Sequence, residues 1–238
     1  MEELANEDAR AALDHNDEEN LCDALGRGAD PNCRFRKPRK FTLLTYACYY
    51  AFDACCRLLL ARGADPNLPD GFGRSPLHWA CVRKDSTRVA SQRECVGQLL
   101  DAGAEVNLCH GNNGNTALHV ACGSGCEPIV KFLIRRGASL EVKTSDGFTP
   151  LGFAVFNNRR NTALTLLRAG ATLQVLIQRW VRPNNRTLND YMIEIVNEGG
   201  WAAHAQKHED ACLRVVSRCV RLPRDVMLSI AAYWSLPH

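Results

Sequence analysis

The chain has 238 residues, of which 46% are apolar, and a formal net charge of +3. This length and apolar content suffice for a continuous core, while the small net charge favours neither a nucleic acid nor a membrane as partner. No apolar run approaches the ~18–20 residues of a membrane span, and the acidic N-terminus lacks the apolar core of a secretory leader, so the 12 cysteines are expected to be reduced thiols of a cytoplasmic or nuclear protein.

Residues 1–23 hold nine carboxylates against a single basic residue, Arg10. Apolar residues recur at helical spacing from Leu4 to Leu13 and again from Leu21 to Leu25, which predicts two amphipathic helices with a polar outer face. Such a pair suits the solvated end of a stack of helices. The alternative role of this acidic surface is to dock a basic partner.

Residues 34–40 form a basic stretch, with five basic side chains in seven positions. Pro38 disfavours a helix, so we expect a loop. Three interpretations fit: a solvated loop that offsets the acidic N-terminus, a contact for an acidic protein or a phosphate, or a nuclear import signal.

A repeat becomes visible at residues 63–67, which read Gly-Ala-Asp-Pro-Asn, as residues 28–32 do. Glycines end five units at spacings of 35, 40, 34 and 33 residues, at Gly28, Gly63, Gly103, Gly137 and Gly170. An alanine precedes a leucine by 12 residues in three of the units, but by 19 residues in the third, from Ala80 to Leu99. The sequence therefore predicts a repeat of about 33 residues with an insertion in the third unit, and we expect residues 83–93 to form a flexible surface loop there.

Two segments resemble the Thr-Pro-Leu-His-x-Ala opening of the ankyrin repeat. Residues 75–80 read Ser-Pro-Leu-His-Trp-Ala, and residues 116–121 read Thr-Ala-Leu-His-Val-Ala. Residues 149–154 lack the histidine, and residues 42–47 lack both the proline and the histidine. The resemblance covers residues 4–173 and implies stacked helix pairs, with hairpin loops that project from one edge.

We therefore expect an all-α ankyrin-repeat solenoid followed by a helical C-terminal segment. The first unit has no such opening and resembles a capping repeat. The units are placed at about 4–33, 34–68, 69–108, 109–142 and 143–173, and the C-terminal segment at 174–238. The resemblance implies a monomeric, non-catalytic module that binds a protein partner, since a rigid concave surface keeps the ordering cost of association low.

The partner is expected to contact the hairpin loops and the inner faces of the first helices. Side chains at these places are Arg34, Phe35, Arg36, Lys37, Arg39, Tyr49, Tyr50, Phe72, Arg74, Arg83, Asn112, Asn113, Asn115, Asp146, Phe148 and Phe156. The pair of tyrosines can anchor a partner, although packing into the core accounts for them equally well.

No constellation of residues indicates an enzyme, a metal site or a cofactor. Histidines and cysteines share helices near His78 and near His119, but the sequence contains no Cys-x-x-Cys and no second ligand pair at zinc-finger spacing. The family resemblance implies instead that each histidine hydrogen-bonds within its own hairpin and helix start. Residues 111–114 are glycine-rich, but no Gly-Lys-Ser/Thr follows, so they predict a turn rather than a phosphate-binding loop.

Beyond Gly170 the sequence predicts further helices, the last of them beginning at Pro223. This last helix resembles the opening of an F-box, and also the second half of a suppressor-of-cytokine-signalling box, both of which recruit ubiquitin-ligase machinery. The pattern consists of Leu222, Pro223, Val226, Ile230 and Tyr233. Only four residues follow Trp234, and the Leu-x-x-x-Cys element of the second box is missing.

Three roles are open for residues 222–234. They are a capping helix that closes the solenoid, which we expect; a helix that binds a ligase adaptor, which would make the protein a substrate-recognition subunit of a ubiquitin ligase; and a helix that docks another partner.

Overall fold

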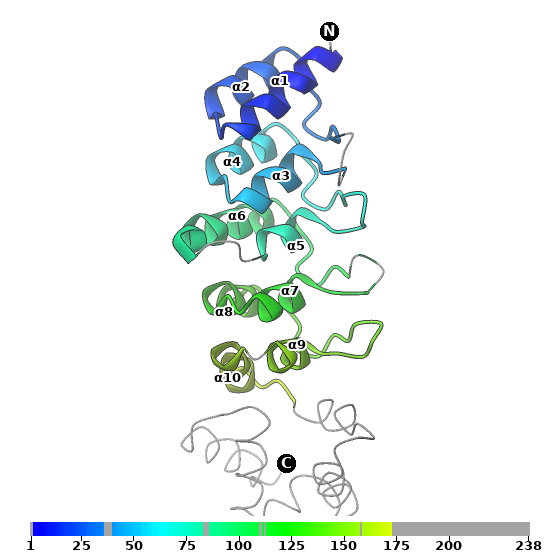
Figure 1. Ribbon diagram of the computed structural model, residues 1–238, viewed down its shortest axis with the longest axis vertical. Coiled ribbons are helices and arrows are strands. Elements are labelled where there is room, and N and C mark those ends of the chain that lie inside the picture. The colour runs from blue at the N-terminus through cyan, green and yellow to red at the C-terminus, as the bar shows by residue number, and fades with distance from the viewer. Residues whose placement is uncertain are drawn as a thin grey trace, which may run out of the picture.

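The computed structural model describes residues 2–35, 40–82, 86–109, 111, 113–157 and 159–172. Over these ranges the chain forms helix pairs that stack along one axis from the N-terminus onward (Figure 1). The described part contains no strand, and its one isolated β-bridge joins Arg34 to Thr42. The predicted all-α class is confirmed. Within the same ranges, no helix is long and apolar enough to cross a membrane.

Each repeat unit contributes one helix pair. The pairs are α1 (Glu2–Asp14) with α2 (Glu18–Gly26), α3 (Leu43–Tyr50) with α4 (Asp53–Ala61), α5 (Pro76–Ala80) with α6 (Val89–Asp101), α7 (Ala117–Ser124) with α8 (Glu127–Arg135), and α9 (Pro150–Phe156) with α10 (Arg160–Arg168). A short 3-10 helix, η1 (Ser86–Arg88), precedes α6.

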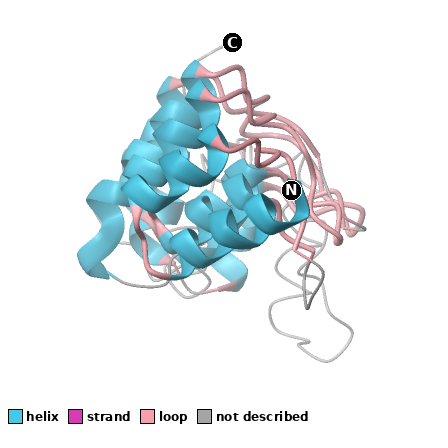
Figure 2. Cartoon of the chain, turned by 90° about the horizontal axis from the view of Figure 1, so that it is seen from above, coloured by secondary structure: helices cyan, strands magenta, loops and turns pink. Residues whose placement is uncertain are grey.

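The first and second helices of the pairs form two layers. The inner layer consists of the first helices, in which α1 contacts α3, α3 contacts α5, α5 contacts α7 and α7 contacts α9. The second helices make the same chain of contacts and form the outer layer. The long loops between units gather on one side of the stack (Figure 2), next to the inner layer.

Hydroxyl side chains cap three of the inner helices, and one of them is Thr149, which accepts from the Gly152 N–H at 3.3 Å. Thr42 accepts a hydrogen bond from the Thr45 backbone N–H at 3.0 Å, and Thr116 accepts one from the His119 N–H at 3.5 Å. These caps satisfy backbone donors that the first turn of a helix leaves unpaired. The Thr/Ser positions of the repeat are therefore helix starts.

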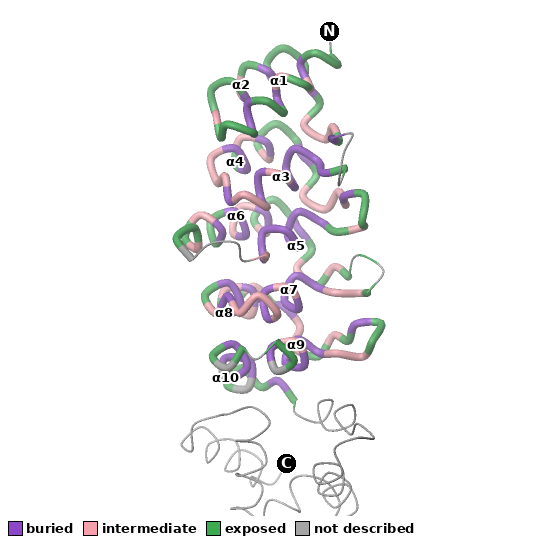
Figure 3. The backbone as a smooth tube through the Cα atoms, viewed as in Figure 1, coloured by how far each residue is buried: buried purple, intermediate pink, exposed green. Residues whose placement is uncertain are grey.

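The alanines and leucines that reveal the repeat form the centre of the core, along the interior of the stack (Figure 3). All are fully buried: Ala47, Leu59, Ala80, Leu99, Ala121, Leu133, Ala154 and Leu166. Small alanines let neighbouring helices approach closely, while leucines fill the space between the layers. Each unit shares this core with its neighbours, so no unit is packed on its own.

The insertion in the third unit differs from the prediction. We expected a flexible loop over residues 83–93, but residues 86–88 form η1 and Val89–Arg93 are the first turn of α6. Gln92 is buried, and its side-chain amide donates to the Val82 carbonyl at 2.7 Å. The polar insertion therefore lengthens the second helix of the unit, because one of its polar side chains finds a backbone partner in the preceding turn.

A ladder of asparagine side chains links one inter-unit loop to the next. Asn67 accepts from the Glu105 N–H at 2.9 Å and donates to the Gly103 carbonyl at 3.1 Å. Asn32 and Asn107 make the equivalent pair of bonds to the units that follow them. The repeated Gly-Ala-Asp-Pro-Asn sequence thus fixes the spacing of neighbouring units.

Candidate functional site

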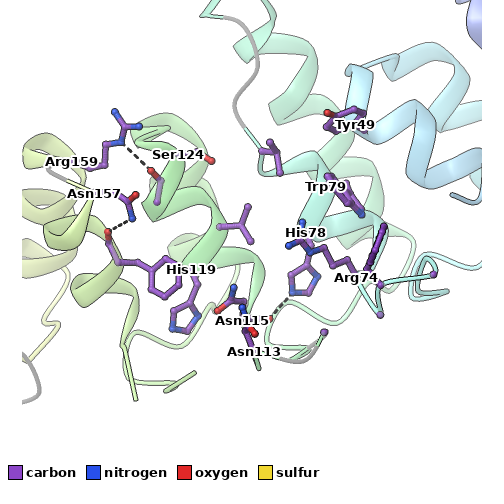
Figure 4. A pocket seen from close by; sticks show the side chains of 18 residues that line it. Tyr49, Arg74, His78, Trp79, Asn113, Asn115, His119, Ser124, Asn157 and Arg159 are labelled. Carbon is purple, nitrogen blue, oxygen red and sulfur yellow. Dashed lines mark hydrogen bonds between the residues drawn. The ribbon is translucent and has the colours of Figure 1, made fainter. Parts of the chain in front are cut away.

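A groove of about 1210 Å³ lies where the inter-unit hairpin loops meet the inner layer. Its walls and floor come from the second to the fifth unit (Figure 4). The hairpin loops contribute Phe72, Arg74, Asn113 and Asn115, and the inner helices contribute mainly apolar or small side chains. The groove therefore lies on the side of the stack where the sequence predicts the partner contact.

The loop of the third unit is held in shape by a buried carboxylate. Asp70 accepts hydrogen bonds from the backbone N–H groups of Phe72 at 2.8 Å and Arg74 at 2.9 Å, and from the Trp79 indole N–H at 2.9 Å. The Arg74 guanidinium carbon lies 5.0 Å from the centroid of the Trp79 ring, in cation–π contact. This support leaves the Phe72 side chain 57% exposed.

Neighbouring hairpin loops pack directly on each other. A Cβ atom on Gly73 would lie 3.3 Å from the backbone nitrogen of Gly111, and the positive φ of Gly73, 73°, disfavours any other residue. One unit further on, the Ser145 N–H donates to the Asn113 carbonyl at 3.0 Å. The loops thus form one wall of the groove.

Two of the inner helices, α5 and α7, are each connected to the following loop by one histidine. The Nε2 atom of His78 donates to the Asn115 carbonyl at 2.8 Å, and that of His119 donates to the Phe148 carbonyl at 3.0 Å. Each Nδ1 atom lies 2.8 Å from the hydroxyl at the start of its own helix. Burial lowers the pKa of His119, so the imidazole stays neutral. The hydrogen bond within the helix start, which the family resemblance implied, is therefore present. The hydrogen bond to the next loop is an additional link between units.

The floor of the groove is hollowed by a change in side-chain size between units. The aromatic pair Tyr49-Tyr50 in α3 occupies the register that Gly123-Ser124 occupies in α7. Arg159 reaches this place, and its Nε donates to the Gly123 carbonyl at 3.0 Å. The small residues in the fourth unit therefore leave room for side chains of the fifth unit, Phe153, Asn157 and Arg159, which line the groove there.

Five predicted contact residues meet at the groove. They are Tyr49, Phe72, Arg74, Asn113 and Asn115. Tyr49 is half-buried and lies 5.0 Å from the Trp79 ring, centroid to centroid, so it both packs and faces the groove.

Other predicted residues lie elsewhere. Phe35 is 8% exposed, because its ring packs against Tyr46 at 5.2 Å between centroids; it was expected on the surface and is part of the core. Tyr50 stacks on Phe52 and faces Tyr46. Arg34 is exposed beside the N-terminal units, away from the groove.

Three predicted residues of the fifth unit lie beyond the groove. Asp146 and Phe156 are exposed, and Phe156 keeps 61% of its surface accessible. Phe148 is half-buried between the rings of Phe153 and Phe156, at 5.9 Å from each centroid. Phe148 and Phe156 form a separate aromatic edge.

The remaining predicted residues lie outside the described residues. They are Arg36, Lys37, Arg39, Arg83 and Asn112, together with the C-terminal pattern Leu222, Pro223, Val226, Ile230 and Tyr233. Their roles stay predictions.

Sequence reasoning missed Trp79, Arg159 and the pair Gly123-Ser124, all of which line the groove. The signal for the pair was available in the register of the repeat, where the second unit has two tyrosines and the fourth has two small residues. Arg159 carries no such signal, because it comes from the turn between α9 and α10.

The charged side chains that line the groove are Arg74 and Arg159, and the described lining residues include no carboxylate. The thiols offer no reactive group at this place. Burial raises the pKa of Cys48, Cys81 and Cys122, which keeps these cysteines protonated. No cluster that could hold a metal ion occurs among the described residues.

Comparison with known proteins agrees with the architecture. A family model described as "Ankyrin repeats (3 copies)" matches residues 9–107 and 87–176, which together span more than half of the chain.

Individual relatives match shorter stretches. B-cell lymphoma 3 protein homolog of Mus musculus is 35% identical over 121 residues, which are 49% of this chain and 25% of that protein. Ankyrin repeat and SOCS box protein 16 of Homo sapiens is 40% identical over 108 residues, or 45% of this chain and 22% of that protein. Ankyrin repeat and SOCS box protein 18 of Homo sapiens is 36% identical over 145 residues, or 50% and 31%. The chain thus spans less than a third of each of these relatives.

Proposed function

Because the chain belongs to the ankyrin-repeat family, we propose that it is a non-catalytic module that binds a protein partner in the groove between its hairpin loops and its inner helices. Ankyrin repeats serve as protein–protein interaction modules, so the class of function follows from the family. The groove, the partner and the residues that contact it are our proposal.

The observation that carries the proposal is the groove itself, with an exposed aromatic ring at its rim. Phe72 is 57% exposed, and the loop that presents it is fixed by three hydrogen bonds that Asp70 accepts, one of them from the Trp79 indole N–H. An aromatic side chain on a rigid support gains contact area on association with little loss of conformational freedom. This is the property that an anchor for a partner requires.

Affinity capture with matched variants tests the proposal. Ser124→Trp places a large ring over the floor of the groove, whereas Arg135→Trp places the same ring on exposed outer helix α8. Proteins captured by the parent chain should be lost with the first variant and kept with the second, as measured by quantitative mass spectrometry. Equal capture by both variants would exclude the groove as the binding surface.

A second function is a substrate-recognition subunit of a ubiquitin ligase. Two of the relatives carry a SOCS box in their names, and residues 222–234 have a pattern that resembles part of such a box. In this arrangement the repeats bind the substrate and the C-terminal helix binds the adaptor.

Removing residues 222–238 tests this second function. The shortened chain should keep the partner that depends on the groove but lose cullin-adaptor proteins from the captured set. If no cullin-adaptor protein is captured by the full chain, the ligase function is wrong.

A further inference from the structure

We propose that the groove recognises an extended peptide segment that carries acidic side chains at two places, one for Arg74 and one for Arg159, with apolar side chains between them. The inference rests on the proposed function and names the chemical class of the partner.

Charge is the first argument. The described residues that line the groove include two arginines and no aspartate or glutamate. Asp70, the carboxylate next to this surface, is 4% exposed and already accepts three hydrogen bonds. A partner that brings carboxylates therefore meets two exposed cations, Arg74 and Arg159, and the nearby carboxylate of Asp70 is buried.

The two arginines are also held in position before any partner binds. The Arg74 guanidinium lies on the Trp79 ring, and that ring is fixed by its hydrogen bond to Asp70. A guanidinium that stacks on a ring keeps its N–H donors at its edge, where they can form the paired hydrogen bonds that carboxylates accept. Arg159 is anchored by one nitrogen, Nε, on the Gly123 carbonyl.

The positions of the arginines set the length of the segment. Arg74 belongs to the third unit and Arg159 to the fifth, and they lie at different sides of the groove (Figure 4). Packed helices are about 8–10 Å apart, so two units cover about 16–20 Å. An extended chain advances about 3.3 Å per residue, so the acidic positions are separated by at least about five residues.

The surface between the arginines suits apolar side chains. Val82, Val120 and Phe153 are half-buried there, and the Phe153 ring packs against Gly123. A single-stranded nucleic acid would also present anions to the arginines. The apolar, glycine-containing floor and the modest net charge of +3 favour the peptide.

The test uses a displayed library of random peptides of about twelve residues, roughly twice the derived span. Selection on the parent chain should enrich peptides with acidic residues on both sides of an apolar stretch. Arg74→Gln and Arg159→Gln should each weaken a selected peptide about tenfold, since a hydrogen bond to a charged group is lost. Arg135→Gln removes the same charge from exposed outer helix α8 and should change nothing.

Two further variants separate the possible outcomes. Arg159→Lys keeps the charge and should lose less affinity than Arg159→Gln, while thermal melts confirm that each variant is folded. Ser124→Trp should abolish binding of any peptide seated in the groove. If Ser124→Trp blocks binding but the arginine variants do not, the groove binds a partner of different chemistry and this inference fails. If Ser124→Trp has no effect, the proposed function fails as well.

Selected peptides that are not enriched in acidic residues, or a library that yields no selected peptide at all, would overturn the inference. A fluorescent oligothymidylate of about twelve nucleotides tests the alternative that the groove binds a single-stranded nucleic acid. Tighter binding of this oligonucleotide than of the selected peptides, with loss of binding in Arg74→Gln and Arg159→Gln, would assign the groove to a nucleic acid instead.

Discussion

Single buried side chains determine how firmly one unit holds the next. Leu133 is fully buried between the layers of the fourth unit. Replacing it with alanine leaves a cavity and should lower the free energy of unfolding by about 2–5 kcal/mol. Denaturant unfolding measures this loss. Leu4→Ala is the control, because Leu4 is 62% exposed and its truncation should have almost no effect. Equal unfolding curves for the two variants would contradict the placement of Leu133.

The asparagine ladder makes a second prediction about individual side chains. Asn67→Ala removes both hydrogen bonds to the next loop, to the Glu105 N–H and the Gly103 carbonyl. The loss should destabilise the fold by about 1–2 kcal/mol, because two hydrogen bonds between neighbouring loops are lost. Hydrogen exchange of the Glu105 amide should become faster before the whole chain unfolds. An unchanged exchange rate would show that the ladder does not connect the units.

At the scale of the structural element, His119 joins helix α7 to the loop that follows it. Its pKa is lowered by burial in the folded state, while the unfolded value is about 6.5. At a pH between the folded and the unfolded pKa, the unfolded state therefore binds more protons than the folded state. The contribution of neutral His119 is complete above about pH 6.5 and is lost as the pH falls toward the folded pKa.

Unfolding experiments at pH 7.5 and at mildly acidic pH test this direction of the change in stability with pH. The parent should lose stability as the pH falls, and His119→Gln, which cannot titrate, should lose less over the same interval. Identical pH dependence in the two proteins would mean that other groups account for it.

Sequence patterns predicted the helix pairs well because the repeat depends on small groups of residues with strict roles. Alanine permits close helix contact, leucine fills the core and threonine caps a helix, so each type occurs at a fixed register. The groove was harder to predict. Its floor depends on the difference between Tyr49 and Gly123, which the sequence shows only when the second and fourth units are aligned residue by residue. Arg159 is an isolated surface residue until the fold brings it to the Gly123 carbonyl.

For the solenoid as a whole, stability is shared along the stack, since each unit packs on its neighbours. We expected residues 222–238 to close the end of the solenoid, and that expectation remains a prediction. If they do, the shortened chain should melt at a lower temperature and aggregate, because apolar groups become exposed. A shortened chain that stays monomeric and melts like the parent would exclude the capping role and favour the role in adaptor binding.

The central claim is that the groove side of this stack, and not its outer layer, contacts the partner. Site-specific photo-crosslinking in cells tests it without knowledge of the partner. A benzophenone amino acid replaces Phe72, which is 57% exposed at the rim of the groove, or Arg135, which is exposed on outer helix α8. We predict a crosslinked protein from position 72 that is absent from position 135 and disappears with Ser124→Trp. Crosslinks from position 135 alone, or crosslinks from position 72 that persist with Ser124→Trp, would contradict the account.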